Sequence, residues 1–324
     1  MDPVRADLHG LKLLHQVLPP ALWTTAAGIS SLLVFMGTGQ GTMTQDFLVS
    51  QKSMLFDSVQ ACIELFSRME TRNAQDPTTA ITYQNPSIYG QVNLWYSCHP
   101  SVRMDNNLYG LLTMTEKFLP YFSEELRRSW LAFLGLLADC DPMQVPEAPR
   151  RSWEEVYRWI VETGLMGFGS GLAPFQFTNN IVLGGLATAP SPAAMAQWIC
   201  ANKSYGAFTG LGVMGFRLTK TSSPAAVRAA FICFYSWLDR WLTANDKEIL
   251  RFNTIFVEQL LCKVGRWNNR LQTMARINLQ EEARRIFEGI DWESGANIED
   301  HTKFPIPSSG AFPIEIFRRI VEEG

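Results

Sequence analysis

Apolar residues recur at about the helical period through most of the chain, and this pattern predicts a mainly α-helical protein. The predicted helices follow polar residues that can begin a helix, namely Thr44, Ser123, Ser152, Ser191 and Ser223. After Ser223 the expected core stripe is Val227, Ala230, Phe231, Phe234, Leu238 and Trp241. In the next predicted helix the inward positions are Ile249, Phe252, Phe256 and Leu260.

Several helix starts and ends can be read from single residues. Ser152 and Glu155 have the spacing of a capping box, in which each side chain accepts a hydrogen bond from the other residue's backbone N–H. Ser191 and Ser223 each precede a proline, which suits the first position of a helix. Gly164 is placed to end the helix that begins after Ser152.

The prolines and the chain length together predict two helical lobes. A chain of 324 residues exceeds what one hydrophobic core usually organises, and three prolines lie between Pro142 and Pro149. The expected order is an N-terminal helical lobe (1–141), a proline-rich hinge (142–150), a C-terminal helical lobe (151–288) and a partly extended C-terminal arm (289–324). We therefore expect an all-α fold in two lobes, with an arm suited to docking on a neighbour.

The most apolar segment near the start, residues 21–37, is predicted to be a buried core helix. It is shorter than a typical membrane span and contains two threonines and two serines, so no membrane association is expected. Asp2 and Asp7 argue against a secretory signal, and the six scattered cysteines favour a reducing compartment. These features predict a cytoplasmic or nuclear protein, or a virion component if the protein is viral.

Charge is unevenly distributed along the chain. Residues 203–276 carry eleven basic and four acidic side chains, a net charge of +7. The first 200 residues and residues 286–324 each carry −5, and the whole chain carries −3. A basic block inside a mildly acidic protein indicates a local surface for polyanions rather than general coating of nucleic acid. The plainer interpretation is the solvated surface of a large helical lobe.

Ten residues of this block are candidate nucleic-acid contacts. Three of them recur at i, i+3 and i+7, so they would share one helical face, and two aromatic residues could stack on bases. The cations are Lys203, Arg217, Lys220, Arg228, Lys263, Arg266, Arg270 and Arg276, and the aromatic residues are Tyr205 and Trp267.

Two glycine-rich segments, 164–171 and 206–215, are unusual in a helical protein. They can be helix-to-helix turns that need positive φ, or loops whose amide groups approach a phosphate. Gly210, Gly212 and Gly215 match GxGxxG, but the upstream residues read as helix rather than strand, so a dinucleotide site is not expected. The four histidines form no pair with metal-ligand spacing. We expect no catalytic residue, metal or cofactor.

These observations favour a non-enzymatic, self-assembling structural protein that holds single-stranded RNA or another polyanion in a basic cleft between two helical lobes. This general plan resembles that of RNA-virus nucleoproteins and some helical coat proteins, although no motif of a named family is present. Homo-oligomers would form through the terminal segments. A helical enzyme or small-molecule binder with an apolar pocket lined by the glycine-rich loops is one alternative, and a protein–protein adaptor is another.

Overall fold

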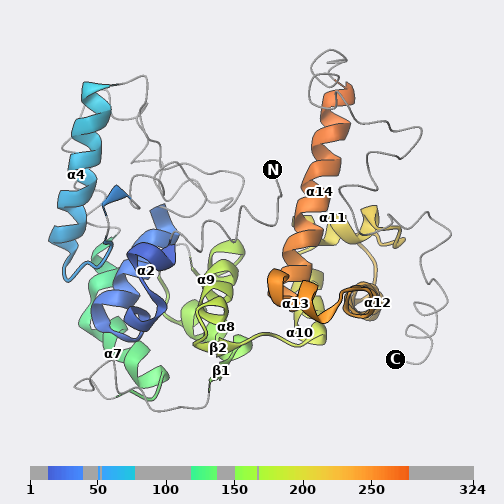
Figure 1. The fold of residues 1–324 in the computed structure, drawn as a ribbon, viewed down its shortest axis with the longest axis horizontal. Coiled ribbons are helices and arrows are strands. Elements are labelled where there is room, and N and C mark those ends of the chain that lie inside the picture. Colours follow the sequence, from blue (N-terminus) through green and yellow to red (C-terminus); the bar gives the residue numbers. More distant parts are fainter. Residues whose placement is uncertain are drawn as a thin grey trace. The chain divides into compact units, whose positions relative to one another are not determined.

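The computed structural model describes residues 14–38, 50–51, 53–76, 118–136, 150–165 and 168–276, without the side chains of 266–276 and of a few α4 positions. Almost all regular structure in these ranges is helical, which confirms the predicted all-α class (Figure 1). The predicted arm (289–324) and all of the predicted hinge except Arg150 lie outside the described ranges. Within those ranges, no helix combines the length and hydropathy that crossing a membrane requires.

The chain divides into two compact units, residues 1–189 and 190–324. The sequence interpretation placed the boundary between lobes earlier, at 142–150. The difference concerns residues 151–189, because Val156, Trp159 and Phe177 are buried in one cluster with residues of the N-terminal region. We refer to these compact parts as unit 1 and unit 2.

Unit 1 combines helices with one very short pair of parallel strands. Its helical elements are η1 (Pro20–Thr24), α2 (Ala26–Thr38), α4 (Val59–Gln75), η6 (Leu119–Phe122), α7 (Glu124–Phe133), α8 (Trp153–Glu162) and α9 (Leu172–Leu183). Strand β1 (Arg151–Ser152) pairs in parallel with β2 (Ala187–Thr188), which ties the start of α8 to the segment after α9.

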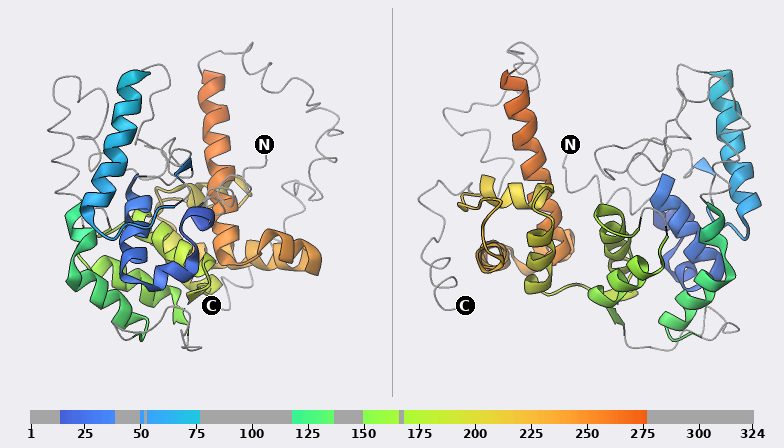
Figure 2. Two further views of the ribbon diagram at one scale, coloured as in Figure 1. Left: turned by 60° about the vertical axis from the view of Figure 1, so that its left-hand side comes forward. Right: turned by 180° about the vertical axis from the view of Figure 1, so that it is seen from behind.

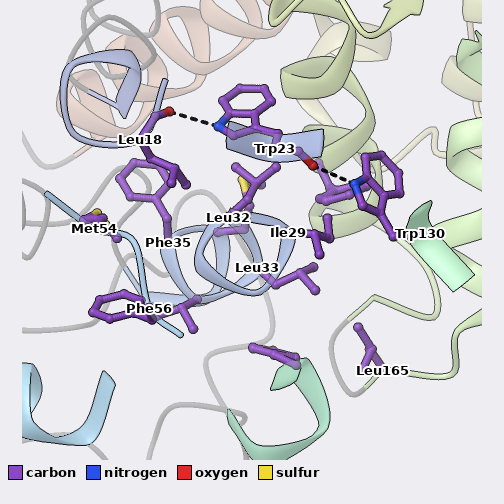
Figure 3. Packing of buried hydrophobic residues seen from close by; sticks show 14 of the residues in the cluster. Leu18, Trp23, Ile29, Leu32, Leu33, Phe35, Met54, Phe56, Trp130 and Leu165 are labelled. Atoms are coloured by element: carbon purple, nitrogen blue, oxygen red, sulfur yellow. Dashed lines mark hydrogen bonds between the residues drawn. The ribbon is translucent and has the colours of Figure 1, made fainter. Parts of the chain in front are cut away.

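Helix α2 lies at the centre of the unit 1 core. It is apolar on all sides, as expected for a helix surrounded by other elements, and its residues from Ile29 to Met36 are buried. The indole N–H of Trp23 donates to the Leu18 carbonyl at 2.9 Å, and that of Trp130 donates to the Trp23 carbonyl at 2.7 Å (Figure 3). The indole N–H groups of Trp23 and Trp130 therefore both have an acceptor. The buried core helix predicted over residues 21–37 is confirmed from Ala26 onward, whereas residues 21–24 belong to the separate 3-10 helix η1 and Thr25 between the two is extended.

Unit 2 contains five described helices (Figure 2). These are α10 (Pro192–Ala201), α11 (Gly206–Val213), α12 (Pro224–Trp241), α13 (Ala244–Leu250) and α14 (Thr254–Arg276). Helix α10 packs against α12, and α11 crosses α14 (Figure 1). The buried Thr254 hydroxyl donates to the Pro190 carbonyl at 2.7 Å, which joins the start of α14 to the start of the unit.

The predicted caps at Ser123, Ser152, Ser191 and Ser223 are confirmed, whereas Thr44 lies outside the described residues. One predicted helix begins later than expected. Ser123, Ser152, Ser191 and Ser223 each accept a backbone N–H of the following helix. Helix α4, in contrast, begins at Val59 with Ser58 as its cap, and residues 53–58 before it are not helical.

Two predicted core positions are also wrong. Ile249 is 66% exposed and Trp241 is 54% exposed. The predicted helix that contained Ile249 is interrupted at Arg251, which adopts a left-handed conformation (φ 49°) between α13 and α14. This break shifts the helical phase, so inward positions on α14 do not predict the inward positions of α13. Trp241 is the last residue of α12, where the core no longer covers the helix.

Candidate nucleic-acid interface

Of the predicted cations whose side chains the structure describes, the exposed ones lie in the connection between α11 and α12 and at the beginning of α12. Helix α11 ends before Gly215, whose positive φ of 98° turns the chain, and the buried Phe216 then anchors the loop. Arg217 and Lys220 follow and are exposed. Arg228, in the second turn of α12, is exposed as well.

Lys203 lies in the segment between α10 and α11, and its side chain contacts this loop. Its Nζ donates to the carbonyl oxygen of Lys220 at 2.9 Å and to that of Ser222 at 2.7 Å. The same ammonium lies 5.9 Å from the centre of the Phe208 ring. The structure therefore brings Lys203 and Lys220 together, but it gives Lys203 backbone partners within the protein.

Acidic residues are scarce in the sequence around this loop, and most of those that follow it have other roles. No Asp or Glu occurs between Glu162 and Asp239. Asp239 pairs with Lys247 at 2.8 Å, Asp246 completes a capping box with Thr243, and Glu258 is buried.

The exposed cations have no acidic partner within the described part of the chain. Among the residues that the structure describes, Arg217, Lys220 and Arg228 form no ion pair. We call these three residues and Lys203 the α11–α12 basic surface. An unneutralised surface of this kind attracts anions.

The predicted basic stripe on α14 is described only in part. Leu261 and Gly265 face α11, and Lys263 lies about 200° around the helix from Leu261, on the side away from α11. Lys263 is half-buried. The other predicted contacts on α14 belong to its helical backbone, but their side chains lie outside the described part of the chain, namely Arg266, Trp267, Arg270 and Arg276.

Tyr205 has a packing partner inside unit 2. It is the residue before α11, it is half-buried, and its ring stacks on Trp198 with centroids 5.8 Å apart and planes 24° from parallel. One ring face is therefore occupied by the protein. Base stacking by Tyr205 and Trp267 stays a prediction.

The two glycine-rich segments have different structures. In the first, Gly164 and Gly171 have positive φ and lie at the end of α8 and the start of α9, so the interpretation as a helix-to-helix turn is confirmed there. In the second, the interpretation as a turn is wrong for most of the segment, because residues 206–213 form α11.

The glycines of α11 serve helix packing. A Cβ on Gly206 would lie 2.7 Å from Cys262 Sγ, and a Cβ on Gly210 would overlap the Leu261 carbonyl. On α14, a Cβ on Gly265 would overlap the Gly206 carbonyl. The GxGxxG match therefore lies within and just after helix α11, and its first glycine lies in a helix crossing instead of at a strand end.

The described residues also bear on a metal site. Among the side chains that the structure describes, no three His, Cys, Asp or Glu groups come together as metal ligands would.

One signal that sequence reasoning missed was readable in the sequence, the run without acidic residues from 163 to 238. The role of Lys203, in contrast, depends on its hydrogen bonds to Lys220 and Ser222, which are 17 and 19 positions further along the chain. Such contacts are visible only in the three-dimensional structure.

Comparisons of this chain with protein-family models, with curated proteins and with solved structures gave no match.

Proposed function

We propose that this chain is a non-enzymatic structural protein that binds single-stranded RNA, or a similar polyanion, and assembles with copies of itself. The observation that carries the proposal is the α11–α12 basic surface. Its exposed cations form no ion pair among the described residues, in a stretch of chain without Asp or Glu. Binding through such cations releases counterions from the nucleic acid, so affinity should fall steeply as salt rises.

The polarity of the loop also supports a phosphate contact. Thr219, Thr221 and Ser223 are exposed, and hydroxyl groups of this kind donate to phosphate oxygens. Arg217 and Lys220 alternate with these residues along the chain. Cationic and hydroxyl side chains on one loop suit recognition of a backbone and carry no base specificity.

Self-assembly rests on the charge of the remaining chain. The basic block carries +7, whereas residues 286–324 carry −5. We propose that acidic terminal segments help to order neighbouring copies. The measurement is the oligomeric state at low and high salt by light scattering and negative-stain imaging. A chain that stays monomeric with RNA present would contradict assembly.

The RNA proposal is tested with a fluorescently labelled single-stranded RNA over a range of salt concentrations. The variant Arg217→Gln/Lys220→Gln/Arg228→Gln should lower the slope of log affinity against log salt by about 2, since each phosphate neutralised on a single strand contributes about 0.7. The matched control removes three exposed arginines of unit 1 instead, in Arg68→Gln/Arg72→Gln/Arg128→Gln. The control should leave the slope unchanged. Equal slopes for both variants would refute the proposed surface.

A further inference from the structure

Lys203 differs from the other cations of the α11–α12 basic surface in the position of its ammonium group. Two of its three N–H donors are directed at backbone carbonyls, those of Lys220 and Ser222, at 2.9 and 2.7 Å. Both acceptors are neutral, so the positive charge is retained although the donors are engaged. The group is therefore oriented toward the loop.

The loop also has hydrogen bonds of its own. The Thr219 N–H donates to Ser222 Oγ at 2.8 Å, and the Ser222 N–H donates to the Thr219 carbonyl at 2.9 Å. These bonds close a tight turn around Lys220. They span only three residues, so they shape the turn without fixing it to the rest of the unit. The buried Phe216 anchors the beginning of the loop, and the contacts of Lys203 attach the turn around Lys220.

The backbone segment that carries Lys203 is held in place by packing within unit 2. Lys203 follows α10, which packs on α12, and it precedes Tyr205, whose ring stacks on Trp198 of α10. Helix α11 then crosses α14 at backbone distance through Gly206 and Gly210. Because these elements are closely packed, a bond from Lys203 fixes the loop relative to the core of unit 2.

We infer that Lys203 is a positioning residue for polyanion binding, an inference that rests on the proposed function. It holds the α11–α12 loop in the conformation that exposes Arg217 and Lys220, and it does not itself neutralise a phosphate. A loop that is ordered before binding loses less conformational entropy when the polyanion arrives.

The two possible roles of Lys203 give different salt dependence. A lysine that contacts a phosphate contributes about 0.7 to the slope of log affinity against log salt on a single strand. A lysine that only orders the loop leaves the number of phosphate contacts the same. Its loss lowers affinity by a similar factor at every salt concentration, so the two lines are parallel.

The experiment compares full-length wild type, Lys203→Met, Lys203→Arg and Lys220→Gln, with a labelled oligouridylate as the probe. Lys203→Met should weaken binding about three- to tenfold at every salt concentration with an unchanged slope, because the loop must then be ordered on binding. Lys203→Arg, which can still donate to both carbonyls, should restore affinity to within about twofold. Lys220→Gln should lower the slope by about 0.7.

Two results would overturn the inference. A slope lowered in Lys203→Met as in Lys220→Gln would show that Lys203 contacts a phosphate. Unchanged affinity in Lys203→Met would show that the loop needs no attachment. Wild type that fails to bind RNA would instead refute the proposed function itself, so the two failures are distinguishable.

A measurement without RNA tests the attachment separately. Hydrogen exchange at the amides of residues 219–222 should be faster in Lys203→Met than in wild type, whereas exchange in α8 and α9 of unit 1 should be unchanged. Lys203→Gln is the second variant if Lys203→Met does not fold, since glutamine is polar and uncharged. Unchanged exchange in the loop would contradict the role assigned to Lys203.

Discussion

The crossing of α11 and α14 gives the sharpest prediction about stability. Gly210→Ala places a methyl group onto the carbonyl oxygen of Leu261, which is backbone and cannot rotate away. The helices must separate, or α11 must shift. Gly212→Ala is the matched control, because it lies two residues further along the same helix and a Cβ there would meet nothing within 4 Å.

The magnitude follows from the comparison of these two variants. Both gain helix propensity, worth up to about 1 kcal/mol for Gly→Ala within a helix. Only Gly210→Ala also has the overpacking cost, which is typically about 1–3 kcal/mol. The difference in the free energy of unfolding between the two variants therefore isolates the crossing. We expect Gly212→Ala to be as stable as wild type or slightly more stable, and Gly210→Ala to be less stable by about 1–3 kcal/mol than Gly212→Ala.

The assay is urea denaturation of the full chain, followed by hydrogen exchange in peptides from α11 and α14 so that unit 2 is observed by itself. Peptides from α2 and α7 report on unit 1 and should not change. If Gly210→Ala and Gly212→Ala unfold at the same urea concentration, the helices do not approach as closely as described, and the reasoning fails.

Two further predictions concern unit 1. The Arg127 side chain is 12% exposed and donates to Ser30 Oγ at 3.0 Å. Arg127→Met should therefore lower the free energy of unfolding by about 1–3 kcal/mol. The control is Arg128→Met at an exposed position, which should stay within about 0.5 kcal/mol of wild type. Equal stability of the two variants would contradict this role. Hydrogen bonds from the backbone and side chain of Ser152 hold the pKa of Glu155 below its ordinary value of 4.5. The stabilisation by the ionised Glu155 is therefore present above pH 4.5 and is lost as the pH falls through the lowered pKa. On acid titration, Glu155→Gln should lose less stability than wild type. An identical acid profile would refute the assignment.

Helix starts were predictable because their signals are local. A serine that precedes an apolar period, as at Ser123, Ser152, Ser191 and Ser223, needs only its own backbone neighbours to act as a cap. The break at Arg251 has no such signal, since arginine rarely adopts positive φ and nothing in its side chain favours it. Inward positions predicted across that break were therefore partly wrong.

The glycines of the second glycine-rich segment, 206–215, show a different limit of prediction from sequence. Glycine usually lowers helix stability, so a run of glycines favoured a turn over a helix. Gly206 and Gly210 are nonetheless helical, because their missing side chains allow the backbone of α14 to approach. That advantage depends on Gly265, far along the sequence, and only the tertiary structure shows it.

The candidate surface was predictable in its charge and not in its arrangement. Charge counts alone indicated Arg217, Lys220 and Arg228, and these residues are exposed. Lys203 was predicted as an equivalent contact, although its donors bind the loop carbonyls. Hydrogen bonds of a long, flexible side chain depend on the packing of several helices and cannot be read from spacing.

Photochemical cross-linking maps where the polyanion lies and tests the central claim most directly. The full chain would be irradiated with a 4-thiouridine-labelled single-stranded RNA, and the attached peptides would be identified by mass spectrometry. We predict cross-links within residues 203–228, and their loss in Arg217→Gln/Lys220→Gln/Arg228→Gln. Cross-links concentrated in unit 1, or a pattern that the triple variant leaves intact, would contradict the α11–α12 basic surface as the binding site.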